Sequence, residues 1–120
     1  IVVADDNQDA ADSLAKLLSM MGNDVRTAYD GVDAVDLVSQ FRPDVVMLDI
    51  GMPRMNGHEA CRRIRDIPGL SGVVMIAVTG WGQDEDRLLS QEAGFDLHLT
   101  KPIDPAAVES LLATLPAPIR

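Results

Sequence analysis

Short apolar runs alternate with segments of helical periodicity along this chain. The apolar runs occupy residues 1–4, 25–28, 45–48, 73–78 and 97–100. Each has the length of a strand and is bounded by polar or turn-forming residues, so each predicts a β-strand, the second being the weakest. Apolar residues at three- and four-residue spacing predict five helices, over residues 11–21, 32–41, 58–67, 83–93 and 105–115. Asp104 and Pro105 predict the start of the last helix, as N-cap and first helical residue.

Five strand–helix units in a chain of 120 residues predict an α/β fold with a doubly wound parallel sheet. Right-handed crossovers, and the need for helices on both faces, favour the strand order 2-1-3-4-5. The chain reverses direction between strands 1 and 3 in this order, and ligands of such sheets bind at the carboxyl ends of the strands beside that point.

Polar residues of related chemistry follow four of the predicted strands. Asp5 and Asp6 follow the first, Asp49 the third, Thr79 the fourth and Lys101 the fifth. Taken singly, each aspartate is more often a turn or cap residue, the threonine a turn residue and the lysine a solvated one. Because the carboxyl ends of parallel strands meet at one edge of the sheet, we expect all five side chains to converge.

Three converging carboxylates repel one another and require a compensating cation. At about 4 Å and an effective dielectric of about 20, each pair costs on the order of 4 kcal/mol. Oxygen ligands favour Mg²⁺ (or Mn²⁺). One carboxylate could then act as a nucleophile and form an acyl phosphate, while Lys101 and Thr79 neutralise phosphoryl oxygens. A cis bond between Lys101 and Pro102 would aim the lysine into the crevice.

Composition limits the classes of partner that this protein can bind. The net charge of −9 argues against direct contact with nucleic acid or an anionic membrane, since both repel an acidic surface. Cys61 is the one cysteine, so an intrachain disulfide is excluded, and we expect a small packed or half-exposed residue there. No apolar run approaches the roughly 20 residues of a membrane span. The chain opens inside a strand pattern without Met, so we expect one domain over residues 1–120 of a longer cytoplasmic protein.

Four segments match short motifs of one known family, in the family's order. They read VVADDN over residues 2–7, LDIGMPRMNG over 48–57, VTG over 78–80 and LTKP over 99–102. On these segments the chain resembles the receiver domain of two-component response regulators over essentially its whole length. The resemblance implies a flavodoxin-like (βα)5 three-layer sandwich, a class whose known examples include a receiver with this strand order.

The resemblance also implies roles for individual residues. Asp49 would accept a phosphoryl group from a phosphohistidine of a partner histidine kinase or phosphotransfer domain. Asp6 would bind Mg²⁺ directly, Asp5 through water, and Gly51 through its backbone carbonyl. Thr79 and Lys101 would bind phosphoryl oxygens. The domain would thus be a signalling switch and not an enzyme, apart from slow hydrolysis of its own acyl phosphate.

His98 departs from the family pattern, because receivers usually carry Tyr or Phe three residues before the lysine. The resemblance implies that this position couples to Thr79 and to a signalling surface of helix 4, strand 5 and helix 5. His98 either takes part in a modified switch or is a strand histidine facing solvent. Together with Trp81, it resembles receivers fused to hybrid sensor histidine kinases.

Two other functions remain open at this stage. One is a receiver-like interaction module that is never phosphorylated. The other is an aspartyl-nucleophile phosphohydrolase, although Gly51 stands where such enzymes carry a second aspartate, and the chain has no insertion large enough for a cap. The sequence names neither the partner kinase nor the oligomeric state.

Two surface assignments also follow from the pattern. The arginines at positions 62, 63 and 65 are predicted to form a solvated face of the third helix. Met20 and Met21 are predicted to pack on the first helix.

Overall fold

The computed structural model describes residues 1–52, 54–70, 72–79, 93–101 and 103–114. Its strands are β1 (Val2–Ala4), β2 (Arg26–Ala28), β3 (Val45–Asp49), β4 (Val74–Thr79) and β5 (Leu97–Thr100). Its helices are α1 (Gln8–Met20), α2 (Gly31–Phe41), α3 (Gly57–Arg65) and α5 (Pro105–Ala113). The helix predicted over residues 83–93, Trp81 and the bond to Pro102 lie outside the described residues.

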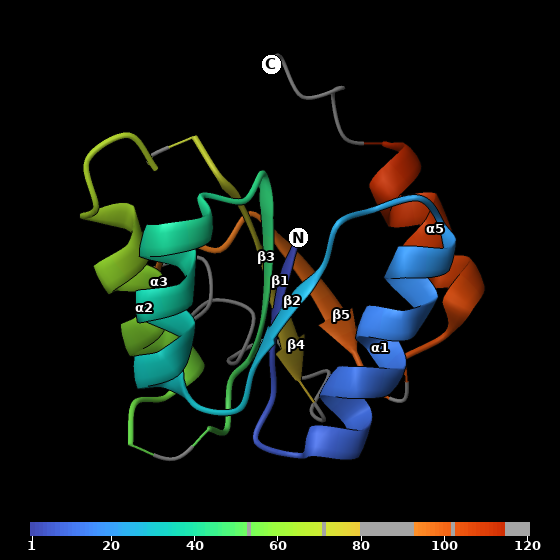
Figure 1. The fold of residues 1–120 in the computed structure, drawn as a ribbon, viewed down its shortest axis with the longest axis horizontal. Coiled ribbons are helices and arrows are strands. Elements are labelled where there is room, and N and C mark those ends of the chain that lie inside the picture. The colour runs from blue at the N-terminus through green and yellow to red at the C-terminus, as the bar shows by residue number, and fades with distance from the viewer. Residues whose placement is uncertain (53, 71, 80–92, 102, 115–120) are drawn as a thin grey trace.

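The strands form one parallel sheet in the order β2-β1-β3-β4-β5, which confirms the predicted topology. Helices α2 and α3 cover one face and α1 and α5 the other (Figure 1). The result is the flavodoxin-like three-layer sandwich that the alternation of strands and helices predicted. None of the described helices has both the length and the apolar character needed to cross a membrane.

The side chains of the continuous apolar strands pack into two separate hydrophobic cores, one on each face of the sheet. Along β3, Val46 and Leu48 pack under α2 and α3, whereas Val45 and Met47 pack under α1 and α5. The side-chain period of two thus buries both faces of the strand, as expected for a parallel sheet covered on each side. The aliphatic cores fix the strand register, because a one-residue slip would exchange the two faces.

Polar side chains cap all four described helices. Asn7, Asp30, Asn56 and Asp104 each accept a hydrogen bond from a backbone N–H in the first turn of α1, α2, α3 and α5. The capping role predicted for Asp104, with Pro105 as the first helical residue, is confirmed. These caps satisfy N–H groups that have no partner within the helix, and they fix where each helix starts relative to the sheet.

Each of the two surface assignments is wrong at one residue. Met20 is 78% exposed, so it does not pack on the first helix, whereas Met21 lies against the α1/α5 core as predicted. Arg65 does not belong to the solvated face of α3. Its guanidinium donates hydrogen bonds to the carbonyls of Gly94 (2.7 Å) and Val73 (2.5 Å) and pairs with Asp96 at 2.7 Å. It ties the end of α3 to the loops that precede β4 and β5.

Cys61 is fully buried in the α2/α3 core, so of the two expected alternatives it is the packed residue and not the half-exposed one. Burial raises the pKa of its thiol to about 11, so the group is a protonated, packed residue at neutral pH.

The burial of Leu18 and the exposure of Met20, both in the last turn of α1, predict different effects of alanine substitution on stability. We expect Leu18→Ala, at a fully buried position, to lower the free energy of unfolding by about 2–5 kcal/mol, because it leaves a cavity under the sheet. Met20→Ala should change it by no more than about 0.5 kcal/mol, because the side chain is exposed. Urea denaturation of both variants measures the difference. Equal effects would contradict the packing described for this helix.

Candidate functional site

The sheet register brings the predicted site residues to one edge. Ala4 pairs with Leu48, so Asp5 and Asp49 come next to each other on adjacent strands. Thr79, the last residue of β4, pairs with Thr100 on β5, and Lys101 follows directly. All of these residues lie at the carboxyl ends of their strands, and Asp5 and Asp49 flank the point where strand order reverses between β1 and β3.

The period of two also decides which way these side chains point. Val3, Met47 and Leu99 pack in the α1/α5 core, and two residues further along their strands come Asp5, Asp49 and Lys101. The three charged groups therefore share one face of the sheet. Thr79 and His98 have the other parity along β4 and β5, since His98 pairs with Ala77, a residue of the α2/α3 core.

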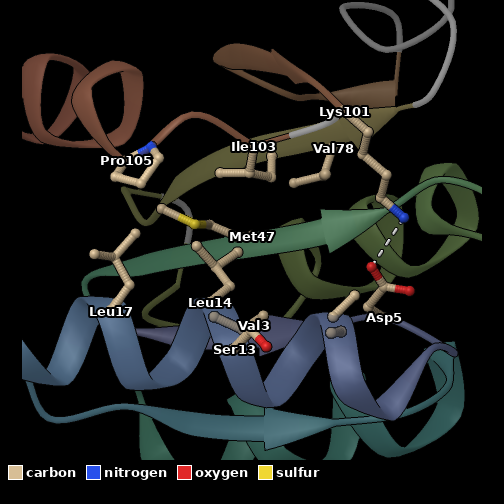
Figure 2. Close-up of a pocket in the computed structure, with 12 residues that line it drawn as sticks. Val3, Asp5, Ser13, Leu14, Leu17, Met47, Val78, Lys101, Ile103 and Pro105 are labelled. Atoms are coloured by element: carbon tan, nitrogen blue, oxygen red, sulfur yellow. Dashed lines mark ion pairs between the residues drawn. The ribbon is translucent and has the colours of Figure 1, made fainter.

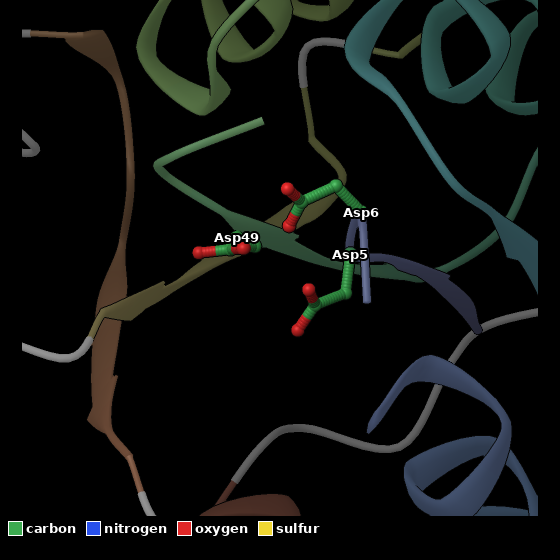
Figure 3. A group of neighbouring side chains, drawn as sticks. All are labelled: Asp5, Asp6 and Asp49. Carbon is green, nitrogen blue, oxygen red and sulfur yellow. The ribbon is translucent and has the colours of Figure 1, made fainter. Parts of the chain in front are cut away.

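Asp5, Asp6 and Asp49 form a compact acidic cluster. One carboxylate oxygen of each lies within 4.8 Å of the others (Figure 3). Asp5 and Asp49 are buried, with 6% and 8% of their surface exposed, whereas Asp6 is exposed. This set of oxygen ligands, partly withdrawn from water yet open on one side, fits a small hard cation such as Mg²⁺.

The Lys101 ammonium lies between two of these carboxylates. Its Nζ is 2.9 Å from Asp5 Oδ2 and 3.5 Å from Asp49 Oδ2. The pair with Asp5 is the shorter, and it stands at the polar end of a cleft of about 720 Å³ between α1 and the β5–α5 connection (Figure 2). The walls of that cleft are mainly aliphatic.

Burial and mutual charge set the protonation of this group. Burial, followed by repulsion from Asp5, raises the pKa of Asp49 to about 6 in spite of the attraction of Lys101. Burial also acts to raise the pKa of Asp5, but the Asn7 N–H and Lys101 outweigh it and hold that pKa below the usual value. Burial acts to lower the pKa of Lys101, and the two carboxylates outweigh it, so the pKa is raised. Of these two buried carboxylates, Asp49 is thus the one less favoured as an anion.

Backbone N–H groups orient the two buried carboxylates. The N–H of Asn7 donates to Asp5 Oδ1 at 3.0 Å, and the N–H of Gly51 donates to Asp49 Oδ1 at 3.3 Å. Both contacts span two residues, so each aspartate forms a local turn with the loop that follows its strand. The second oxygen of each carboxylate is the one that faces Lys101.

The loop after Asp49 depends on two glycines that the sequence reasoning did not assign to the site. A Cβ at Gly57 would lie 2.6 Å from the carbonyl oxygen of Asp49, and a Cβ at Gly31 would lie 1.9 Å from that of Met55. Neither distance allows a side chain, so the loop packs backbone against backbone at both places. Gly57 ends one of the family-like segments, which was the available signal; Gly31 had none.

His98 does not face solvent. Both of its ring nitrogens are buried, and the residue as a whole is only partly exposed. The alternative of a solvent-facing strand histidine is therefore wrong. Thr79 is 4% exposed, and its backbone carbonyl accepts a hydrogen bond from the N–H of Lys101 at 2.7 Å. This contact links the end of β4 to Lys101, whose ammonium pairs with Asp5 and Asp49.

Comparison with known sequences identifies the family. The family model of the response regulator receiver domain matches residues 1–113. The response regulator MprA of Mycobacterium sp. (strain KMS) is 39% identical over 124 residues, which cover 100% of this chain and 50% of the relative. MprA of Mycobacterium tuberculosis (strain ATCC 25177 / H37Ra) is 37% identical with the same coverage. The chain therefore spans about half the length of these curated relatives.

Solved structures give the same assignment. The receiver domain of the sensor histidine kinase PA1611 from Pseudomonas aeruginosa, described with a magnesium ion coordinated in its active-site cleft, is 28% identical. Its TM-score is 0.85, over 92% of this chain and 91% of that one. The chemotaxis protein CheY4 of Vibrio cholerae is 25% identical, with a TM-score of 0.89 over 95% and 96%. The chain belongs to the response regulator receiver domain family, whose members are signalling switches rather than classical enzymes.

The raised pKa of Asp49 predicts a pH-dependent effect on stability in the absence of divalent cations. The folded-state pKa of about 6 lies above the ordinary 3.8, so ionisation of Asp49 lowers stability as pH rises from about 4 to about 6. Asn cannot ionise. We expect Asp49→Asn to be more stable than the wild type near pH 7 by about 1–3 kcal/mol, and the difference to vanish near pH 4.

Denaturant unfolding in the presence of a chelator, at several pH values, measures this difference. Asp36→Asn, at an exposed position in the middle of α2, is the control for loss of one negative charge. A stability gain of Asp49→Asn that is the same at pH 4 and pH 7 would contradict the assignment to Asp49 ionisation.

Proposed function

We propose that this domain is a phospho-accepting switch in which Asp49 receives a phosphoryl group from a phosphohistidine of a histidine kinase or phosphotransfer domain. The observation that carries the proposal is the position of Asp49. It is a buried carboxylate at the strand-order reversal, clustered with Asp5 and Asp6 and paired with the Lys101 ammonium. Membership of the receiver family supports the same reading.

The acidic cluster would hold Mg²⁺, or Mn²⁺ in its place. Asp6 and Asp49 would bind the ion directly, Asp5 through water, and Gly51 through its backbone carbonyl. The exposed position of Asp6 suits a ligand on the open side of the site. When bound, the ion neutralises charge on a phosphoryl oxygen during transfer. The magnesium ion described in the PA1611 receiver supports this assignment.

The chain's own residues would supply the remaining steps. An oxygen of Asp49 attacks phosphorus, the bond from phosphorus to the histidine nitrogen breaks, and the nitrogen keeps the electron pair. Lys101, already 3.5 Å from Asp49 Oδ2, then pairs with a phosphoryl oxygen, and the Thr79 hydroxyl donates a hydrogen bond to another. Slow attack of water on the acyl phosphate would return Asp49 to its starting state.

The added charge would act as the signal. The acyl phosphate would carry about −1.5 to −2 charges in place of the single charge of the carboxylate, which would draw in Thr79 and rearrange the neighbouring surface of helix 4, β5 and α5. Helix 4 lies outside the described residues. His98, with its ring nitrogens buried beside β4, would replace the usual aromatic residue in coupling Thr79 to that surface. A cytoplasmic location follows from the source of the phosphoryl group.

His98 and Trp81 also favour a receiver carried by a hybrid sensor histidine kinase. The PA1611 receiver, which comes from a sensor kinase, supports this assignment. The curated MprA relatives are response regulators instead. Sequencing the gene on both sides of this segment tests the idea, since a histidine-kinase core upstream is the expected result.

Phosphorylation predicts a defined change in mass. We expect the wild type, incubated with acetyl phosphate and Mg²⁺, to gain one phosphoryl group by intact-mass spectrometry. Asp49→Asn should gain none, because an amide cannot form the acyl phosphate. Asp36→Asn, at an exposed position on α2, should gain one as the wild type does. An unchanged mass of the wild type would contradict the proposal.

The same experiment separates the two other candidate functions. Saturable Mg²⁺ binding without any gain in mass would favour a receiver-like interaction module. Many turnovers per protein on small phosphate esters would favour a phosphohydrolase. The pairing of Lys101 with Asp5 and Asp49, two of the three clustered carboxylates, argues against the first, and Gly51, two residues after Asp49, argues against the second.

Metal binding predicts a gain in stability. We expect Mg²⁺ at about 100 times its dissociation constant to raise the free energy of unfolding by about 2.7 kcal/mol, because the folded state alone presents the three carboxylates together. Asp6→Asn should lose most of this gain, since it removes a direct ligand, while Asp36→Asn should keep it. Thermal unfolding with and without Mg²⁺ measures both. An equal gain in Asp6→Asn would exclude that residue as a ligand.

A further inference from the structure

An ion pair connects the loop after Asp49 to the start of α2. Arg54 Nη1 lies 2.8 Å from Asp30 Oδ2, and Asp30 is the N-cap of α2. We propose that this pair is a tether that positions the metal-binding loop, so that Asp30 and Arg54 act as positioning residues for Mg²⁺ binding and phosphoryl transfer. The inference rests on the proposed function, because it assigns these residues a role in that same site.

Asp30 is built to hold a fixed direction. One carboxylate oxygen accepts the N–H of Asp33 at 2.8 Å, and the other faces Arg54. The side chain is only 12% exposed. A carboxylate held on both oxygens and largely shielded from water is a more rigid anchor than a solvated surface acid.

Arg54 reaches this anchor from an unusual backbone conformation. Its φ is +65°, in the left-handed region that residues with a Cβ seldom adopt. The ion pair with Asp30 is therefore coupled to the shape of the loop: if the pair breaks, Arg54 loses a contact that favours this conformation. The neighbouring Met55 carbonyl packs on the backbone of Gly31, the first residue of α2, so the same stretch of loop meets α2 twice.

The two ends of the loop after Asp49 contact each other beside the site. Gly57 packs on the carbonyl of Asp49 and donates its N–H to the carbonyl of Ile50 at 3.0 Å. Gly51, whose carbonyl is proposed as a metal ligand, therefore lies on a short segment closed at its base by Gly57 and tethered near its end by Arg54. Outer contacts of this kind orient metal ligands, and a ligand held in place before binding costs less to order.

A tether and a simple charge effect predict opposite changes in Mg²⁺ affinity when the charge of Arg54 is removed. Arg54 is a cation on the same loop as a proposed cation ligand. On electrostatic grounds alone, removal of its charge should strengthen Mg²⁺ binding. If the ion pair positions the loop, removal should instead weaken binding, because the Gly51 carbonyl is then less well placed.

The chain offers a matched control. Arg63 pairs with Glu59 at 3.3 Å on the exposed side of α3, with 58% of its side chain exposed, the same fraction as for Arg54. Arg63→Gln removes the same charge and the same kind of ion pair without touching the loop. It should leave Mg²⁺ affinity unchanged or slightly higher.

The experiment is calorimetric titration of Mg²⁺ into the 120-residue chain, wild type and variants. We expect Arg54→Gln to raise the dissociation constant by about 3- to 10-fold, and to slow phosphorylation by acetyl phosphate at subsaturating Mg²⁺. Asp30→Asn keeps the cap and removes the charge, so it should weaken binding too, but add little to Arg54→Gln in the double variant. Arg54→Lys should restore part of the affinity. Circular dichroism checks that each variant is folded.

Arg54→Gly separates the ion pair from the backbone. Glycine adopts the left-handed conformation freely, so a loop that needs only this conformation would keep its Mg²⁺ affinity, and that result would overturn the tether. Unchanged or tighter binding in Arg54→Gln would overturn it as well. A wild type that binds no Mg²⁺ would overturn the proposed metal site itself. If the wild type binds Mg²⁺ and the variants bind it equally well, the metal site stands and only the tether is overturned.

Discussion

The site depends on the balance between three carboxylates and one ammonium at the reversal point of the sheet. Asp5 and Asp49 are buried, and each would repel the other strongly if Lys101 were absent. The Asn7 N–H and Lys101 together hold the pKa of Asp5 low, whereas Lys101 only partly offsets burial and repulsion at Asp49, whose pKa rises to about 6. The cluster is thus left electrostatically unsatisfied at Asp49, the residue proposed to react. A bound cation, and then a phosphoryl group that draws Lys101 away, would both act on this imbalance.

The rest of the fold keeps these charges in place. The two aliphatic cores fix the strand register, and the register aligns Asp5 with Asp49. The loop after Asp49 is held by close backbone contacts at Gly31 and Gly57 and by the pair of Asp30 with Arg54. Rigid strand ends and an anchored loop suit a site whose chemistry relies on positioning more than on acid–base catalysis.

Most of the fold could be predicted from the sequence, because its signals are local. The five apolar runs became the five strands, with no end shifted by more than one residue, and Asp104 became the predicted cap. The failures concern residues whose environment is set by distant parts of the chain. Arg65 reads as one of three helix-surface arginines, yet its guanidinium reaches Gly94 and Asp96, about thirty positions away. His98 lies on the edge strand β5, and the sequence does not show what covers the face of the sheet that it takes.

The sequence by itself determined the strand–helix alternation, the identity of the five polar residues at strand ends and the resemblance to a receiver. These follow from periodicity and short motifs, which need no knowledge of distance. Only the tertiary structure decided that Lys101 lies closer to Asp5 than to Asp49, that Thr79 and His98 take the opposite face of the sheet, and that Arg54 reaches Asp30. Such pairings depend on register, loop path and burial, which arise only when the separate strands and helices pack together.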